Sequence, residues 1–310
     1  MREHEFEPAP RGRSGKRRFD DDDPQFLKRA RHQTPVAFDT NTDTDAPPAA
    51  GDAWSSWDDA LHGPQPRPDW VVTELAAIDV ELGILKTGKE ADVFLVRRGI
   101  PDTDRTCLLA AKRYREPEHR MFHRDAGYLE GRRMRRSREN RAMAARTAFG
   151  RQLIAGQWAA AEFDALSRLW EVATSYGAIS VPYPVQLRGT ELMLEFIGDA
   201  EEGLAAPRLA QLRPEPTELK SLWDQLLDAL TVLARTGFAH GDLSPYNLLV
   251  NAGRLVVIDL PQVIDVVANP NGPALLARDV KNVTSWFAAR GLVQDPNEVT
   301  RRLLDEAGVR

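Results

Sequence analysis

The sequence contains a single cysteine, Cys107, among its 310 residues. One cysteine excludes an intramolecular disulfide framework and any zinc cluster that is built on several cysteines. Long apolar runs are also missing, because stretches such as LVVIDL are far shorter than the about 20 residues of a membrane-spanning helix. The N-terminus lacks the apolar core of a secretory signal peptide. We therefore expect a soluble, cytoplasmic protein that has no contact with a membrane.

The overall composition is that of a globular protein. Hydrophobic residues make up 42% and charged residues 28%, which excludes collagenous and wholly disordered chains. The net charge of -5 excludes a surface that is basic all over. A chain of this length has room for one large domain or for two lobes with a substantial core.

Residues 1–69 differ from the rest of the chain. They hold nine of the 21 prolines, the acidic block Asp20–Asp23 and the basic run Lys16–Arg18. Such a segment buries too little apolar surface to offset its chain entropy, so we predict a disordered, charged tail. Trp54 and Trp57 are unusual there, and two interpretations stay open: an anchor on the folded domain, or an element that binds a partner.

From residue 70 onward the hydrophobic pattern predicts regular elements. Strands are expected at 80–85, 92–98, 107–114, 183–189 and 191–197, and helices at 70–78, 151–174, 216–237, 273–290 and 295–306. This order indicates an α+β, two-lobed protein-kinase-like fold, whose N-lobe has an antiparallel sheet with one helix of the αC type. We assign residues 70–198 to the N-lobe, with a basic flexible loop at about 116–150, and residues 199–310 to a mostly helical C-lobe.

The segment 112–151 is strongly basic. It carries thirteen Lys or Arg residues against five Asp or Glu residues, a local net charge of +8. Two interpretations stay open: contact with RNA or ribosomal particles through the phosphate backbone, and a mobile loop beside an acidic substrate or the phosphates of ATP.

The motif HGDLSPYN, followed by Asp259 after the strand-like GRLVV, carries the strongest chemical signal. Phosphoryl transfer needs a carboxylate that orients the attacking group and oxygen ligands for Mg²⁺. Asp242 suits the first role. Asn247 and Asp259, five and seventeen positions later, suit the second. A turn that Asp and Asn merely cap is the alternative, and the spacing of Asp259 argues against it.

Lys112 stands near the end of the strand LLAAK, and Glu162 falls on the apolar helix face of Leu166 and Leu169. A carboxylate on such a face is costly unless it is paired. We therefore predict an ion pair between Lys112 and Glu162, as in kinases, where a strand lysine bridges the phosphates and a helix glutamate.

A short turn separates the first two predicted strands, 80–85 and 92–98. It contains Thr87, Gly88, Lys89 and Glu90. Gly88 lets backbone amides approach a phosphate, and its neighbours add a hydroxyl and a charge. Without the other motifs, a plain hairpin turn would be the favoured interpretation of these residues.

The RIO kinases, an atypical protein-kinase family, share these motifs. Their signature S-T-G-K-E-A-x-V-[FY] is similar to LKTGKEADVFLV, with Lys86 where the family usually has Ser. QWAAAEFDALSRL resembles W-x-x-K-E-[FY]-x-x-L, with Ala161 in place of Lys. Further matches are LLAAKRYR with A-[VI]-K-[IV]-[YF], ELMLEFIG with L-V-M-E-F-I-G, HGDLSPYNLLV with H-[AG]-D-L-S-x-[YF]-N, VVIDLPQVID with I-D-x-[SG]-Q, and ARDVKNVTSWFAARG with R-D-[IV]-x-N-[IV]-x-x-[FY]-F-x-x-x-G.

The resemblance runs through residues 75–291 in unbroken order, and FHRDAGYLEGRR is similar to the loop that the RIO1-like branch inserts. It implies a compact kinase fold without a long activation segment and the use of ATP with Mg²⁺ or Mn²⁺. It further implies phosphorylation of Ser or Thr in proteins, the kinase itself included, and in some members ATPase activity through a phospho-aspartate. The protein substrate stays unidentified.

Carried over by position, the resemblance implies a role for each motif residue. Asp242 is the catalytic aspartate, Asn247 and Asp259 are metal ligands, and Asp259 is also the acceptor in any phospho-aspartate chemistry. The residues expected to bind ATP are Thr87, Gly88, Lys89, Glu90, Lys112, Glu162, Glu195 and Ile197. Pro261 stands where Ser or Gly is usual and removes a backbone donor beside the metal site.

Two other functions compete with this one. Small-molecule phosphotransferases of the aminoglycoside or choline type share H-G-D-x-x-x-x-N, but they insert a large helical region, and here His240 follows Glu195 by only 45 positions. An ATPase switch that binds RNA or ribosomal particles is compatible with the basic segment.

Overall fold

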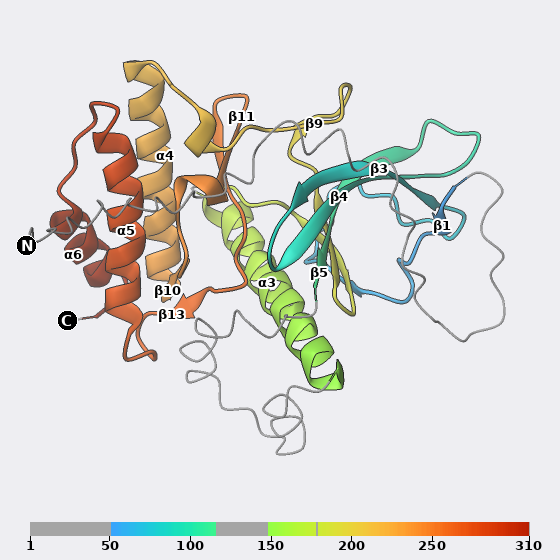
Figure 1. The fold of residues 1–310 in the computed structure, drawn as a ribbon, viewed down its shortest axis with the longest axis horizontal. Helices are drawn as coiled ribbons and strands as arrows, with labels where there is room; N and C mark the ends of the chain where they lie inside the picture. Colours follow the sequence, from blue (N-terminus) through green and yellow to red (C-terminus); the bar gives the residue numbers. More distant parts are fainter. Residues whose placement is uncertain (1–50, 116–147, 178, 310) are drawn as a thin grey trace, which may run out of the picture. The chain divides into compact units, whose positions relative to one another are not determined.

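The structure is a computed structural model and describes residues 51–115, 148–177 and 179–309 (Figure 1). Within these residues the fold is α+β: an antiparallel sheet and one helix come first, and a mostly helical part follows. The main strands are β1 (Ala53–Trp54), β2 (Leu61–His62), β3 (Ile78–Thr87), β4 (Ala91–Gly99), β5 (Thr106–Tyr114), β6 (Pro184–Arg188) and β7 (Glu191–Glu195). The helices are α3 (Ala148–Tyr176), α4 (Pro216–Arg235), α5 (Gly272–Ala288) and α6 (Pro296–Glu306).

Three short strand pairs accompany these elements. β8 (Gly198–Asp199) with β9 (Leu204–Ala205) and β11 (Leu248–Asn251) with β12 (Arg254–Val257) are hairpins, and β10 (Phe238–Ala239) pairs with the more distant β13 (Ile264–Asp265). Two 3₁₀ turns, η3 (Leu209–Gln211) and η4 (Pro245–Asn247), lie between them. The predicted strands and the four later helices are therefore confirmed. Most of the predicted tail, 1–50, and most of the predicted basic loop, 116–147, lie outside the described residues.

The seven-stranded sheet has the order β1-β3-β4-β5-β7-β6-β2, and its neighbouring strands are antiparallel. Successive side chains of a strand point to opposite faces. In β5, the alternating residues Cys107, Leu109 and Ala111 are buried on one face, while Lys112 belongs to the other. The register of β5 therefore decides which face receives the lysine.

The two faces of the sheet have different covers. The face of Leu109 packs against the connections between β1 and β3, with Trp57, Val71, Val72 and Ala77 in one buried cluster. The opposite face packs against α3, which runs alongside the sheet in Figure 1, and joins a second cluster with the helical part. Lys112 thus points toward α3 and the later half of the chain.

Residues 51–69 correct the predicted boundary of the tail. β1 pairs with β3 and β2 pairs with β6, so this part of the chain adds a strand to each edge of the sheet. Trp57 is only 8% exposed, and its ring stacks on His62 at 3.8 Å between centroids. Trp57 thus anchors this segment on the folded domain. The proline-rich composition misled the prediction, because the two strand pairings and the buried Trp57 ring order the segment.

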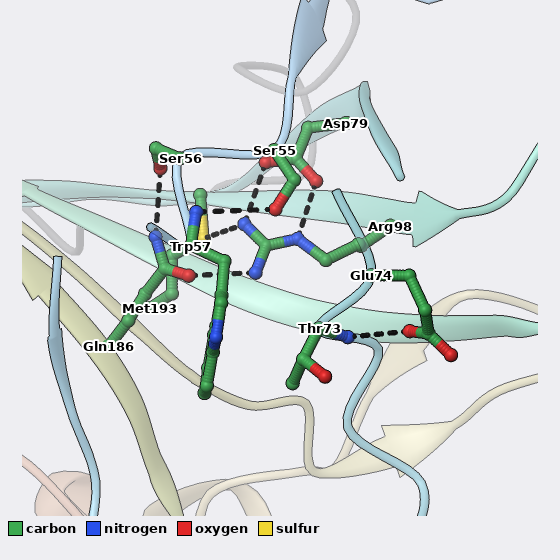
Figure 2. A network of polar contacts seen from close by, with 9 residues as sticks. All are labelled: Ser55, Ser56, Trp57, Thr73, Glu74, Asp79, Arg98, Gln186 and Met193. Atoms are coloured by element: carbon green, nitrogen blue, oxygen red, sulfur yellow. Dashed lines mark hydrogen bonds and ion pairs between the residues drawn. The ribbon is translucent and has the colours of Figure 1, made fainter. Parts of the chain in front are cut away.

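A fully buried arginine joins this segment to the sheet (Figure 2). Arg98 donates from Nε and Nη2 to the two carboxylate oxygens of Asp79, at 2.7 and 2.8 Å, and from Nη1 to Gln186 Oε1 at 2.7 Å. Gln186 in turn donates to Ser56 Oγ at 2.8 Å. A buried ion pair is costly unless its remaining groups are bonded, and this network bonds them.

The helix predicted at 70–78 is wrong. Residues 71–77 form an extended stretch and a turn, in which the Ala77 N–H donates to the Glu74 carbonyl at 3.0 Å. Val71 and Val72 are both buried against the sheet. Two adjacent residues can face a sheet from an irregular segment, and this packing overrides the helical spacing.

The helical half is built from amphipathic helices. α4 begins with Pro216 at its first position, and α6 begins at Asp295, whose side chain accepts the Asn297 N–H. The start of α5 at Gly272 follows Asp259 by only thirteen positions. No helix in the described part of the chain is long and apolar enough to cross a membrane.

Candidate active site

One lysine contacts two carboxylates from distant parts of the chain. Lys112 Nζ on β5 lies 2.8 Å from Glu162 Oε2 on α3 and 2.6 Å from Asp259 Oδ1, which follows β12. Glu162 is 1% exposed and the Asp259 side chain 35%. The predicted pair of Lys112 and Glu162 is therefore present, and Asp259 joins it. We call Lys112, Glu162 and Asp259 the ion-pair cluster.

Glu162 has further partners that satisfy its buried carboxylate. The Tyr114 hydroxyl donates to Oε2, and the Leu260 N–H donates to Oε1 at 3.2 Å. Glu162 faces inward because Leu166 and Leu169, one and two helical turns later, are buried on the same side of α3. A buried carboxylate with this many donors is held in one place.

Charges in the cluster shift the pKa values of its members. Burial by itself would raise the pKa of Asp259, but the charge and hydrogen bond of Lys112 lower it from 3.8 to about 2, and the charge of Lys86 adds to the effect. Burial by itself would lower the pKa of Lys112, but Asp259 and Glu162 hold it above its usual value. Burial, with Glu162 next, raises the pKa of Tyr114 well above 10. Lys112 and Asp259 are therefore both charged at neutral pH, with a neutral tyrosine beside them.

The backbone of Asp259 is in a conformation that non-glycine residues rarely adopt. Its φ is +66°, in the left-handed region. The following residue, Leu260, is bonded through its N–H to Glu162, and Pro261 after it is buried and restricts Leu260 to extended conformations. The strained residue is thus fixed on its C-terminal side, and the carboxylate is directed at Lys112.

Asp242 lies on a loop whose backbone is hydrogen-bonded to a buried residue of α5. Asp279 on α5 is fully buried and accepts the N–H of Gly241 at 2.7 Å and that of Leu243 at 2.9 Å, the two neighbours of Asp242. Asn282 Nδ2 donates to the Leu243 carbonyl at 3.0 Å. Gly241 has φ +83°, and a Cβ there would lie 2.3 Å from a backbone oxygen of Gln262. Only glycine fits this turn.

His240 and Asn247 complete the support of this loop. The His240 ring is buried and its Nε2 lies 3.1 Å from the Ile258 carbonyl, so Nε2 carries the proton and Nδ1 accepts the Asp242 N–H at 3.4 Å. Asn247 Nδ2 donates to the Asp242 carbonyl at 2.9 Å. The Ile258 N–H donates to the Asn247 carbonyl at 3.1 Å, which links the loop to the residue before Asp259.

The structure thus brings the predicted residues Asp242, Asn247 and Asp259 to one hydrogen-bonded region. The Asn247 amide keeps its oxygen for another partner, because its nitrogen serves the Asp242 carbonyl. Within the described ranges, no group of three or more His, Cys, Asp or Glu side chains is arranged to hold a metal ion.

The predicted nucleotide loop is a tight turn between β3 and β4. The Gly88 N–H donates to the Ala91 carbonyl at 3.0 Å, and a Cβ on Gly88 would meet that oxygen at 2.9 Å. The Glu90 carbonyl accepts the Arg115 N–H at 2.8 Å, which fastens the turn to the end of β5. Thr87 and Lys89 are exposed at this turn.

Glu195 and Ile197 lie where β7 leaves the sheet. Glu195 pairs with Leu109, its N–H donates to the Tyr183 carbonyl at 2.9 Å, and its carboxylate accepts the Tyr183 N–H at 3.0 Å. Burial raises the pKa of the Glu195 carboxyl, while the Tyr183 N–H opposes this. The Ile197 carbonyl accepts the Ala206 N–H at 2.9 Å, in the β8–β9 hairpin. Along β5, the partner of Glu195 is Leu109, three residues before Lys112.

Sequence reasoning missed three residues of the site: Tyr114, Asp279 and Asn282. All three lie within segments that resemble the family motifs, KRY and ARDVKNV. Nothing in those motifs indicates that Tyr114 contacts Glu162, or that Asp279 and Asn282 contact the loop of Asp242. Ala161 and Pro261, two of the three departures noted above, line one cavity of about 80 Å³. Neither departure removes a member of the ion-pair cluster.

Comparison with known proteins finds similar chains. A family model described as RIO domain matches residues 110–299. The RIO-type serine/threonine-protein kinase Rio1 of Haloferax volcanii is 31% identical over 233 residues, which covers 74% of this chain and 71% of that protein. Serine/threonine-protein kinase RIO1 of Chaetomium thermophilum is 34% identical over 145 residues, 44% of this chain and 26% of that one. The RIO1 kinase of Saccharomyces cerevisiae is 26% identical over 234 residues, 70% and 46% of the two chains.

Proposed function

Because the chain belongs to the RIO family of serine/threonine protein kinases, we propose that it transfers the γ-phosphoryl group of ATP to Ser or Thr residues of proteins, and to its own. The proposal extends to the residues: Lys112, Glu162 and Asp259 hold the phosphates and their metal ion, and Asp242 orients the attacking hydroxyl. The protein substrate is open.

The observation that carries the proposal is the ion-pair cluster. In protein kinases the ion pair of a strand lysine with a helix glutamate and a metal-binding aspartate must be in place together for transfer to occur. Here one ammonium lies within 2.8 Å of both carboxylates. A chain that kept the fold for structural reasons alone would gain little from three buried or half-buried charges, because burying charges is costly.

Asp242 suits the role of the base because its backbone is immobilised while its side chain is half-buried. Asp279, His240 and Asn247 hold the groups on either side of it. An attacking hydroxyl has to lie within hydrogen-bond reach of the carboxylate, and a fixed loop lowers the entropy that this alignment costs.

The donor set fits a magnesium ion. Mg²⁺ prefers oxygen ligands and is usually bound through one or two carboxylates together with phosphate oxygens and water. Asp259 would supply a carboxylate, which its low pKa keeps ionised, and Asn247 would supply its amide oxygen. When bound, the ion supplies positive charge for the phosphate oxygens. Mn²⁺ takes the same kind of ligands.

The remaining predicted ATP contacts come from the sheet. We assign the phosphates to the turn of Thr87, Gly88, Lys89 and Glu90, and the adenine to backbone groups of Glu195 and Ile197. We assign residues 51–198 to the N-lobe of a kinase fold and residues 199–309 to the C-lobe. The short connection from Asp259 to α5 supports a fold without a long activation segment.

The structure favours this function over a small-molecule phosphotransferase. Such enzymes insert a helical substrate-binding region before the motif of Asp242. Here the chain from Glu195 to His240 is taken up by the β8–β9 hairpin, η3 and α4, and α4 packs into the core. A contact of the basic segment with RNA falls on residues outside the described ranges and stays a hypothesis.

Incubation of the purified protein with γ-labelled ATP and Mg²⁺ or Mn²⁺ tests the proposal. Acid-stable label on Ser or Thr of the protein supports it. Released phosphate with a label that is labile like an acyl phosphate would instead indicate an ATPase that works through Asp259. ATP binding without transfer or hydrolysis would contradict the proposal and favour a kinase that needs a small-molecule acceptor.

A further inference from the structure

Lys86 lies on the same face of the sheet as Lys112. Residues directly opposite one another on antiparallel strands point to the same side. Lys86 on β3 is opposite Val93 on β4, and Val93 is opposite Lys112 on β5. The two lysines are therefore the ends of one row across three strands, with backbones about 10 Å apart.

Lys86 also lies directly before the turn of Gly88. Its Cε is 4.0 Å from the position that a Cβ on Gly88 would take, so the lysine side chain runs along the turn on the side of the site. Lys86 thus lies beside the turn and on the face of the sheet that carries Lys112.

A nucleotide at the ion-pair cluster meets carboxylates that repel its phosphates. Lys112, Glu162 and Asp259 together carry one net negative charge, and Asp242 adds another nearby. A triphosphate brings several negative charges into this field. A second ammonium on the same face of the sheet reduces the repulsion, and a lysine in contact with a phosphate acts as a point charge.

We propose that Lys86 is a second phosphate-binding lysine, which contacts the ATP phosphates from the β3 side while Lys112 contacts them from the β5 side. The inference rests on the proposed function, because it concerns the same nucleotide site. It assigns a role to the position at which this chain has lysine and the RIO signature usually has serine. Lys86 then makes binding of di- and triphosphates less dependent on the metal ion.

Nucleotide affinity measured by competition against a fluorescent ATP analogue tests this. The variants are Lys86→Ser, the charge-keeping Lys86→Arg, and the control Lys220→Ser, whose lysine pairs with Asp224 on the exposed side of α4. ATP, ADP and AMP are each measured with Mg²⁺ and with a chelator. We expect Lys86→Ser to lower the affinity for ATP and for ADP by on the order of tenfold, with a larger loss in the absence of Mg²⁺. The affinity for AMP should stay nearly unchanged.

The outcomes separate the two proposals. Lys86→Arg should bind ATP within about threefold of the unmodified protein, because charge and not packing is the cause. An effect of Lys86→Ser no larger than that of Lys220→Ser, or an equal loss for ATP and AMP, would overturn the role of Lys86 and leave the kinase proposal standing. An unmodified protein that binds none of these nucleotides would overturn both.

Discussion

The ammonium of Lys112 lies 2.6 Å from Oδ1 of Asp259, although the two residues are 147 positions apart. The contact joins the central strand of the sheet to the segment after β12, so the sheet and the helical half are linked at the site itself. Glu162 completes the link from α3. Several consequences of this arrangement can be measured.

Replacement of Glu162 by Gln should destabilise the fold. The amide keeps the shape of the carboxylate but leaves Lys112 with one charged partner in place of two, and it disturbs the hydrogen bonds of Tyr114 and Leu260. We expect a loss of about 2 kcal/mol in the free energy of unfolding, measured by urea denaturation.

A double-mutant cycle with Tyr114→Phe identifies the cause. If the tyrosine hydroxyl acts through Glu162, the two changes should be non-additive by at least about 0.5 kcal/mol. Asp164→Asn on the exposed side of α3 is the matched control and should change the stability by less than about 0.5 kcal/mol. Additive effects of the pair would contradict the contact.

Replacement of Asp279 by Asn should slow transfer without weakening ATP binding. An amide offers one oxygen for two backbone N–H groups, so one neighbour of Asp242 loses its partner and the loop becomes less ordered. We expect kcat to fall by about 10- to 100-fold at nearly constant ATP affinity. Asp228→Asn, on the exposed side of α4, is the control. A parallel loss of ATP affinity would place Asp279 in the nucleotide site instead.

Replacement of Trp57 by Ala should unfold the protein at lower urea. The ring is 8% exposed and is covered by His62 and by the Arg67 guanidinium, 5.2 Å from its centroid. Loss of a buried tryptophan costs about 3 kcal/mol or more. Trp54, three residues earlier, is 42% exposed, and Trp54→Ala should cost less than about 1 kcal/mol. Equal effects of the two changes would mean that the anchor is not Trp57.

Stability should depend on Asp259 at acid pH. Its pKa is about 2 in the folded protein, below its ordinary value of 3.8, so the ionised carboxylate stabilises the fold above pH 4 and this contribution is lost as the pH falls toward 2. The carboxylate is 35% exposed, so solvent screens the interaction, and its contribution to the free energy of unfolding is about 1 kcal/mol. The difference in unfolding free energy between the unmodified protein and Asp259→Asn should therefore narrow from pH 5 to pH 3. A difference in unfolding free energy that stays constant between pH 5 and pH 3 would contradict the lowered pKa of Asp259.

The sequence predicted the pair of Lys112 and Glu162 because an unpaired glutamate on the apolar face of α3 demands a partner. It also predicted the strands and later helices, since their periodicity is strong. Asp279 could not be found in this way, because its contact with the loop of Asp242 depends on how α5 packs. The positions of Trp57 and of Val71 were misjudged for the same reason. The order of both segments comes from the sheet face that they cover, and around Val71 this packing overrides the helical spacing of the sequence.

The most direct test of the central claim measures ATP affinity and phosphoryl transfer in parallel for the unmodified protein and for Asp242→Asn. The account predicts that transfer falls by about 10²- to 10⁴-fold, because the carboxylate that orients the hydroxyl is gone, while ATP affinity stays within about threefold. Transfer at nearly the unmodified rate in Asp242→Asn, with ATP bound equally well, would contradict the assignment of the active site.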